Sequence, residues 1–399
     1  MDPGKNMENF RSKVREYLKR SAETKLKIGV FTISRLAVFG VAIAILVMAA
    51  FALIYILYGN QETQLYLERT PVTLPADYRV DDGILSYRTD SSLETFYGKS
   101  SKEVDSAKLY ASIDGYDVSE TLTILYAGNA VQVRGRQGFS LSAGTISDVR
   151  AGKSHAAVLF RNPAGENHIQ LLDSDGVSLN TILLNDSAVV AFDFLDAGNG
   201  RELLWVSTLD VGQFTEESLV RIYDCDRKGT LLFYSASFYN QTVYDVYLSE
   251  QCLFLVGTQD IVRYHREDDG GFTSEKDRIA VFGSTVVDFA YVEESAYFIT
   301  IPHIGDGTNS HLFRLLTISQ TDDTWATVMQ VHTASPIVGA FLMESQIRVL
   351  TKESFTAYSY TGAVREQIEL KEFPSAAYRY SDTEFLFLTE TECFRAYMK

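Results

Sequence analysis

The sequence feature that most constrains the fold is a unit of four short apolar runs that recurs every 40–50 residues. From residue 76 onward, each run is rich in Val, Ile, Leu, Tyr and Phe and ends at Gly, Asp, Asn or Ser, the pattern of β-strands joined by turns. Four short antiparallel strands per unit are typical of a β-propeller blade. The first strand of four successive units carries an aspartate between apolar residues: Asp148, Asp193, Asp245 and Asp288.

The number of units follows from the two ends of this region. Residues 76–90 align without gaps to residues 376–390, at an offset of 300. Seven periods of about 43 residues fit that offset, which predicts eight blades. The last unit ends after its third strand, so we expect Glu68–Leu74 to supply the fourth strand and close the ring. Seven blades is the alternative, because the first two units (84–142) are irregular.

Residues 36–58 form a second constraint, since this run of 23 residues contains no charge and no proline. A helix of that length is about 35 Å long and spans a hydrocarbon core of roughly 30 Å. Nine Lys or Arg against four Asp or Glu precede it, which places the N-terminus in the cytoplasm. A cleaved signal peptide is the alternative, but it has a shorter basic region and a shorter apolar run.

The predicted organisation therefore has four parts, and it places the bulk of the chain outside a cell membrane. They are a basic cytoplasmic tail (1–35), a transmembrane helix (36–58), a stalk that includes the ring-closing strand (59–75), and an extracytoplasmic all-β propeller (76–399).

The charge of the outer region limits its partners. Residues 59–399 contain 27 basic and 48 acidic residues, a net charge of −21. Such a surface repels phosphate polymers, so we expect no nucleic-acid partner. It suits solubility, and it favours a divalent cation or a basic protein as a ligand. Three cysteines are too few for a disulfide-stapled domain, and we expect Cys225 and Cys252 to be free thiols, with a disulfide between them as the alternative.

The repeats resemble the WD40-like and quinoprotein-like propellers. The layout of basic tail, single membrane helix and outer propeller is similar to that of an uncharacterised bacterial family of single-pass membrane proteins. The chain lacks the Trp-Asp dipeptide of WD40 blades and the Gly-Trp motif of quinoprotein blades. We therefore predict no quinone or other cofactor, and that family carries no site residues to transfer.

Three sets of residues are candidates for a site. If Asp148, Asp193, Asp245 and Asp288 lean toward the axis, they form a partial carboxylate ring that would recruit a cation; the alternative is that each accepts backbone hydrogen bonds. His303, Asp306 and His311 are weak candidates for a metal site. The enlarged loops between second and third strands share one face of the disc and carry the candidate partner-binding residues Glu166, Asp210, Glu216, Glu217 and Asp306.

These patterns favour a scaffold or sensor that docks an envelope protein or a wall component. No catalytic signature is present: the chain has no Gly-x-Ser-x-Gly, no His-Glu-x-x-His and no complete phosphate-binding loop. An enzyme is thus the less favoured reading. The alternatives are an extracytoplasmic hydrolase or lyase acting on glycans, and a cation-binding module at the propeller axis.

Overall fold

The computed structural model falls into two compact units, residues 1–64 and 65–399. It describes the following residues: 25–28, 31–34, 41, 44, 47–48, 65–74, 78–81, 84–89, 92–97, 105–108, 113–185, 187–211, 216–226, 231–267, 271–273, 277–292, 294–303, 310–319, 324–381 and 383–398.

In the first unit, β1 (Lys25–Ile28) and β2 (Phe31–Ser34) form an antiparallel pair. Residues 41, 44, 47 and 48 are helical. Among the residues that the structure describes, no helix is long and apolar enough to cross a bilayer. Most of residues 36–58 lies outside the described residues, so the transmembrane helix stays a prediction.

The second unit is an eight-bladed all-β propeller, and each blade is a four-stranded antiparallel sheet. Eight blades are thus confirmed and the alternative of seven is wrong, because residues 84–142 belong to two separate sheets.

The strands follow the chain from blade to blade. Blade 1 consists of β4 (Tyr78–Asp81), β5 (Ile84–Arg88), β6 (Ser92–Tyr97) and β7 (Asp105–Lys108), and blade 2 of β8 (Gly115–Val118), β9 (Thr123–Ala127), β10 (Ala130–Val133) and β11 (Arg136–Ser140). Blade 3 consists of β12 (Thr145–Ala151), β13 (His155–Arg161), β14 (Asn167–Asp173) and β15 (Ser178–Asn185), and blade 4 of β16 (Ala188–Asp196), β17 (Glu202–Val211), β18 (Glu216–Asp224) and β19 (Leu231–Tyr239).

The remaining blades follow the same order. Blades 5 to 8 consist of β20 (Val243–Leu248), β21 (Cys252–Gly257), β22 (Asp260–His265) and β23 (Asp277–Ala280); β24 (Ser284–Val292), β25 (Ser295–Pro302), β26 (Leu312–Ser319) and β27 (Trp325–His332); β28 (Ile337–Leu342), β29 (Ile347–Thr351), β30 (Ser354–Tyr358) and β31 (Val364–Glu369); and β32 (Ala376–Arg379), β33 (Glu384–Leu388), β34 (Glu392–Met398) and β3 (Leu65–Thr73).

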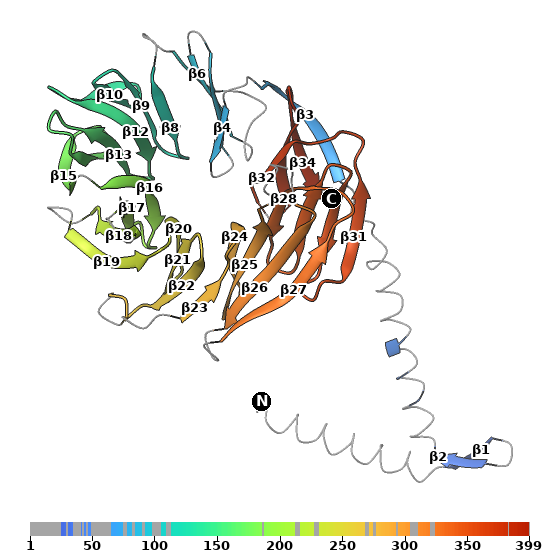
Figure 1. Cartoon of the computed structure of the whole chain (residues 1–399). Helices are drawn as coiled ribbons and strands as arrows, with labels where there is room; N and C mark the ends of the chain where they lie inside the picture. The colour runs from blue at the N-terminus through green and yellow to red at the C-terminus, as the bar shows by residue number, and fades with distance from the viewer. Residues whose placement is uncertain are drawn as a thin grey trace, which may run out of the picture. The chain divides into compact units, whose positions relative to one another are not determined.

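The first strand of each blade lies nearest the axis. β12 contacts both β8 and β16, and β28 contacts both β24 and β32, so neighbouring first strands face one another (Figure 1). Second strands are mainly apolar, because both of their faces are covered by adjacent blades. Every residue of β21 and β29 is buried, whereas residues of the outer strand β31 alternate toward solvent.

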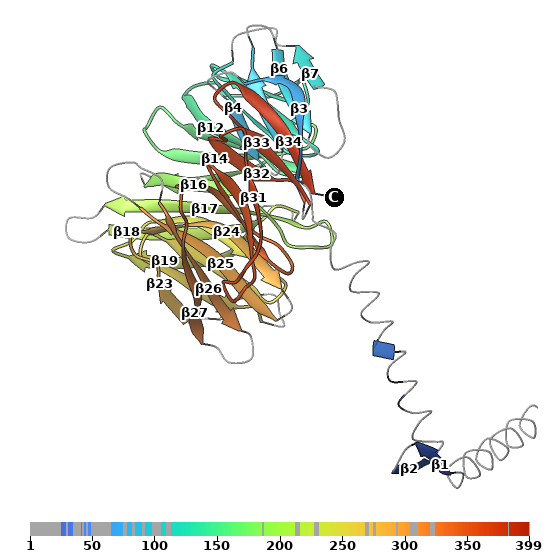
Figure 2. The same cartoon turned by 90° about the vertical axis from the view of Figure 1, so that its right-hand side faces the viewer.

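The ring is closed by the strand nearest the N-terminus of this unit. β3 pairs with β34 from Leu65–Met398 to Arg69–Phe394, then skips register before Thr73–Glu392 (Figure 2). This pairing is the one that the sequence predicted for Glu68–Leu74. β3 is the outer strand of blade 8 and covers the edge of β34, which would otherwise be unpaired.

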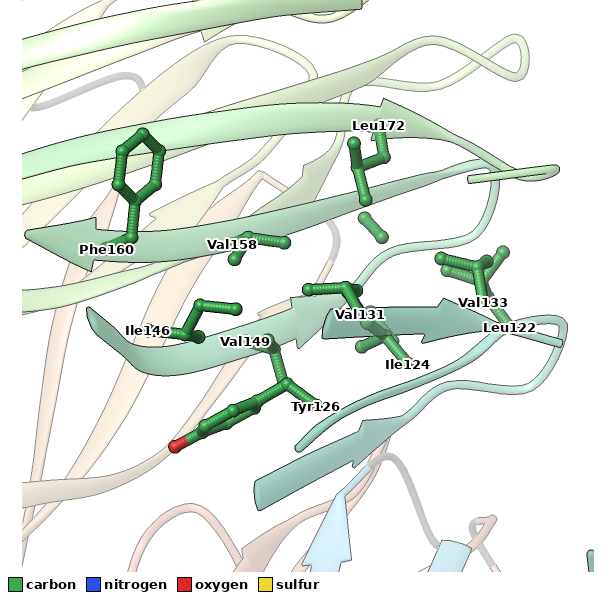
Figure 3. Close-up of a cluster of buried hydrophobic side chains, with 12 residues drawn as sticks. Leu122, Ile124, Tyr126, Val131, Val133, Ile146, Val149, Val158, Phe160 and Leu172 are labelled. Atoms are coloured by element: carbon green, nitrogen blue, oxygen red, sulfur yellow. The ribbon is translucent and has the colours of Figure 1, made fainter. Parts of the chain in front are cut away.

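The hydrophobic core is divided among the interfaces between blades. Figure 3 shows the cluster in which Ile124 and Val131 of blade 2 point toward Val149 and Val158 of blade 3. Comparable clusters of described residues lie at every other interface, including the one between blade 8 and blade 1. Each sheet therefore buries both faces only because the ring is complete.

The side chains that fill these clusters change around the ring. Between blades 2 and 4 they are mainly Val, Ile and Leu. Between blades 7 and 8 five phenylalanines meet, and Phe355 lies 5.1 Å from Phe385 in an edge-to-face arrangement. Aromatic side chains thus fill much of the space between the blades in the C-terminal half of the ring.

Candidate functional site

The predicted axial aspartates follow an irregularity in the inner strands. In β12, β20 and β24 the register shifts by one residue immediately before Asp148, Asp245 and Asp288. A β-bulge of this kind leaves a backbone group unpaired. Each of the three carboxylates accepts a hydrogen bond, at 2.8–2.9 Å, from the backbone N–H of the next residue. The bulge, whose backbone each carboxylate hydrogen-bonds, therefore explains why these three aspartates share one position in their strands.

Asp193 does not occupy the same position. In β16 the bulge lies between Val189 and Ala191, so Asp193 is two residues farther along the strand than its presumed equivalents. Its carboxylate also accepts the next N–H, that of Phe194, at 2.7 Å. The four aspartates therefore do not lie at one level around the axis.

Arginines lie between the acidic groups of the inner strands. None of them was among the site residues predicted from the sequence. Arg150 of β12 donates to Asp148 at 3.0 Å and interacts electrostatically with Asp117 of β8 and Asp193 of β16. Arg379 of β32 lies 3.6 Å from Asp288 of β24. The inner strands thus carry paired charges in place of a purely acidic ring. The gapless alignment of Arg79 with Arg379 was the sequence feature that could have indicated an arginine at this position of the inner strands.

Several of these side chains tie one blade to the next. Asp117 accepts the N–H of Ala151 at 2.7 Å, and Asp288 accepts the N–H of Leu342 at 2.7 Å. Arg379 donates to the carbonyl of the same residue, Leu342. Burial raises the pKa of Asp117 and of Asp288, and the nearby arginines and backbone amides oppose that rise. The carboxylates of Asp117 and Asp288 are thus held by backbone hydrogen bonds from the next blade. The cation-binding ring stays a prediction.

The two faces of the disc differ, and we name them by the connections they carry. The loop face carries the loops between second and third strands and the connections from one blade to the next. The turn face carries the other hairpin turns. Glu166 lies in the loop between β13 and β14, Asp210 in β17, and Glu216 and Glu217 in β18, all on the loop face. Asp306 lies outside the described residues.

Glu166 is held within its own loop. Its Oε2 accepts a hydrogen bond from Asn162 Nδ2 at 2.7 Å, and Asn162 Oδ1 accepts the N–H groups of Ala164 and Glu166. His168 Nε2 is 3.7 Å from the same carboxylate. The carboxylate therefore orders its own loop.

The predicted metal ligands have other partners. His303 Nε2 is 2.6 Å from Thr285 Oγ1, and His311 Nδ1 is 3.3 Å from the carbonyl oxygen of Thr333. Within the part of the chain that the structure describes, no three His, Cys, Asp or Glu side chains are grouped so that they could hold a metal ion. Because Asp306 is not described, the trio as a whole stays a prediction.

The loop face also displays aromatic side chains in solvent. Phe282 is 78% exposed, Phe373 65% and Tyr239 62%. Phe282 stands in a tight turn, in which the N–H of Ser284 donates to the carbonyl of Val281 at 2.9 Å and Gly283 has φ +74°. Val281 is buried and anchors the turn. The backbone therefore holds Phe282 outward, where it has no packing role in the propeller.

A cavity of about 820 Å³ opens on the turn face, between blades 4, 5 and 6. Asp196, Glu250, Arg266 and Tyr291 contribute to its polar wall. Hydrogen bonds from Lys153 and from the N–H of Gly198 lower the pKa of Asp196. A carboxyl group with a lowered pKa is a poor general acid, so this one does not match the acid of a glycoside hydrolase.

The cysteines are free and buried, as expected for Cys225 and Cys252. Burial raises the pKa of the Cys225 thiol, and the carboxylates of Glu202 and Asp226 raise it further. Burial also raises the pKa of Cys393, to about 11. Thiols of this kind are poor nucleophiles at neutral pH.

Comparison with solved structures identifies the architecture. The propeller superposes on the crystal structure of Sqt1 from Saccharomyces cerevisiae with a TM-score of 0.50 and 7% identity, covering 84% of this chain and 98% of that one. It superposes on the WD40 domain of SCAP from fission yeast with a TM-score of 0.53 and 10% identity, again covering 84% and 98%. The fold is a WD40-like β-propeller. No protein-family profile matches the chain, and no curated protein does.

This similarity confirms the expected WD40-like fold, although the propeller lacks the Trp-Asp dipeptide. At identities of 7% and 10% it establishes the fold alone. The resemblance to a bacterial family of single-pass membrane proteins stays a prediction.

Proposed function

We propose that this protein is a membrane-anchored scaffold that docks another protein of the cell envelope on its loop face. The single observation that carries the proposal is Phe282, a large apolar side chain that a rigid turn holds in solvent. Exposed aromatic groups on a rigid surface are the residues that most often dominate a protein interface. WD40-like propellers commonly bind proteins, which supports the same function.

The anchoring part of the proposal is supported by the sequence. The apolar run of residues 36–58 and the basic tail before it favour a single membrane span with the propeller outside the cytoplasm. A short stalk would hold the propeller close to the bilayer, within reach of other membrane proteins. The tail is available to a cytoplasmic or membrane-surface partner.

Crosslinking in intact membranes tests the docking face. Phe282→Ser removes the exposed ring without disturbing a buried contact, and we expect the yield of crosslinked partner to fall at least tenfold, as for an interface hot spot. Leu232→Ser is the matched control, because Leu232 is 55% exposed but lies at the turn-face end of β19. If the two variants retain the partner equally, the loop face is not the docking surface.

A further inference from the structure

A row of three side chains crosses blade 4 at the loop face. Asp210 of β17 lies directly opposite Glu217 of β18, and Glu217 lies directly opposite Tyr239 of β19. Residues that face each other across antiparallel strands project from the same side of the sheet, with Cβ atoms about 5 Å apart. The row therefore places two carboxylates side by side, next to an exposed aromatic ring.

This arrangement is unfavourable for the propeller on its own. Like charges directly opposite each other destabilise a sheet, and no described basic side chain forms an ion pair with Asp210 or Glu217. The chain between the two strands, Gly212–Thr215, contains no Lys or Arg that could neutralise them. Among the residues that the structure describes, the negative charge of this row is therefore not balanced by an ion pair.

The exposed aromatic groups of the loop face favour a polypeptide partner over a metal ion. Tyr239 belongs to blade 4, and Phe282 lies in the connection between blades 5 and 6. A metal ion would not require either ring, whereas a polypeptide can present a cation and an apolar group together. An aromatic ring also attracts an ammonium or guanidinium group through its face.

We infer that the protein docked on the loop face presents a basic segment, with a Lys or Arg on the row Asp210–Glu217–Tyr239 and an apolar side chain on Phe282. This inference rests on the proposed docking function and specifies the chemistry of the partner. The net charge of −21 on residues 59–399 agrees with it, because it steers a basic segment toward the propeller.

Peptide binding to the full-length protein in nanodiscs tests the chemistry. The probe is a synthetic 16-residue peptide that alternates Lys with Leu and Phe, and its twin carries Glu in place of each Lys. We expect the basic peptide to bind and the acidic twin not to bind. In the double variant Asp210→Asn/Glu217→Gln, affinity for the basic peptide should fall about tenfold, and Phe282→Ser should weaken it as well.

A second double variant controls for general electrostatic attraction. Glu250→Gln/Glu267→Gln removes the same charge from two exposed positions at the turn-face end of blade 5, and it should leave peptide affinity unchanged. Equal losses in the two double variants would overturn the inference. So would Ca²⁺ binding that depends on Asp210 and Glu217 while the peptide binds regardless, because the row would then be a cation site.

The folded state provides an independent readout. Because Asp210→Asn/Glu217→Gln relieves a like-charge pair, the unfolding midpoint of this variant should equal or exceed that of the parent. Reduced binding would then not reflect misfolding.

Crosslinking in membranes separates the proposed docking function from the proposed basic chemistry of the partner. If Phe282→Ser loses the partner while Asp210→Asn/Glu217→Gln keeps it, docking stands and the basic chemistry is wrong. If both variants keep it, the docking face itself is wrong.

Discussion

Glu202 shows how a single buried carboxylate joins two blades. It is 5% exposed, and its Oε2 lies 2.9 Å from His155 Nδ1, while the N–H of Lys153 donates to Oε1 at 2.5 Å. Burial alone would raise the pKa of Glu202, but hydrogen bonds from His155 and from the amides of Lys153 and Ser154 lower it. The carboxylate is therefore ionised in the folded protein and fixes the turn of blade 3 against blade 4.

Glu202→Gln tests this contact through its pH dependence. Because the pKa is lower in the folded than in the unfolded chain, the stabilisation is complete above the ordinary value of 4.5 and is lost as pH falls through the folded pKa. We expect the substitution to lower the free energy of unfolding by about 1–3 kcal/mol at pH 7. The difference from the parent should shrink toward pH 3. Urea unfolding across this range measures it, and a difference that is constant with pH would contradict the assignment.

Asp245 should show the opposite dependence of stability on pH, and it serves as the control for Glu202. Burial raises its pKa above the ordinary value of 3.8, although Tyr247 and the N–H of Val246 hydrogen-bond to it. The protonated form is thus favoured in the fold, and that stabilisation is present below pH 3.8 and lost as pH rises through the folded pKa. Asp245→Asn keeps an acceptor for the N–H of Val246 and should raise the free energy of unfolding at pH 7 by about 1 kcal/mol. Lower stability at pH 7 would show that the charged form is the one the site favours.

At the scale of the elements, the closing strand decides whether the propeller is a ring. β3 is separated from its partner β34 by more than 300 residues, and the pair joins the cluster that links blades 8 and 1. The sequence predicted this partner because the last unit lacked a fourth strand. The break in register after Arg69 was not predicted, because the register of two strands so far apart in the chain is set by their tertiary pairing.

Glu68→Pro tests the closure. Glu68 pairs with Arg395 at a hydrogen-bonded position of the ladder, so a proline there removes a backbone donor, and we expect a loss of about 3 kcal/mol in the free energy of unfolding. Chemical denaturation followed by tryptophan fluorescence measures it. Glu68→Ala, which keeps the backbone donor, should cost less than half as much. Equal effects would mean that the β3 ladder contributes little to stability.

The inner strands illustrate what element-level sequence reasoning misses. The repeat of apolar-x-Asp-apolar aligned Asp193 with Asp148, but the bulge of β16 lies two residues earlier relative to its aspartate. The position of a bulge is set by the hydrogen-bond ladder with the neighbouring strand, and residue identity alone does not reveal it. In blade 7 a glycine follows the equivalent bulge, and the ring of Phe341 lies 3.0 Å from where a Cβ at Gly339 would lie.

For the whole molecule, the central expectation is orientation in the membrane. A basic tail of residues 1–35, a charge-free run and an acidic propeller predict that the C-terminus lies outside the cytoplasm. Protease added to intact cells should therefore cleave a C-terminal epitope while an N-terminal epitope stays protected. A C-terminal epitope that is cleaved only after lysis would contradict this orientation and, with it, a docking role in the envelope.

Local apolar patterns and turn residues predicted the β class, the period of the blades and the strand that closes the ring, and they favoured eight blades over seven. Which charges meet was set by the packing of the blades against one another. Asp117, Arg150 and Asp193 lie on three different blades, and their pairing depends on how the inner strands face one another. The tertiary structure also decided that Phe282 stands in solvent, since exposure is set by neighbours that are distant in the chain.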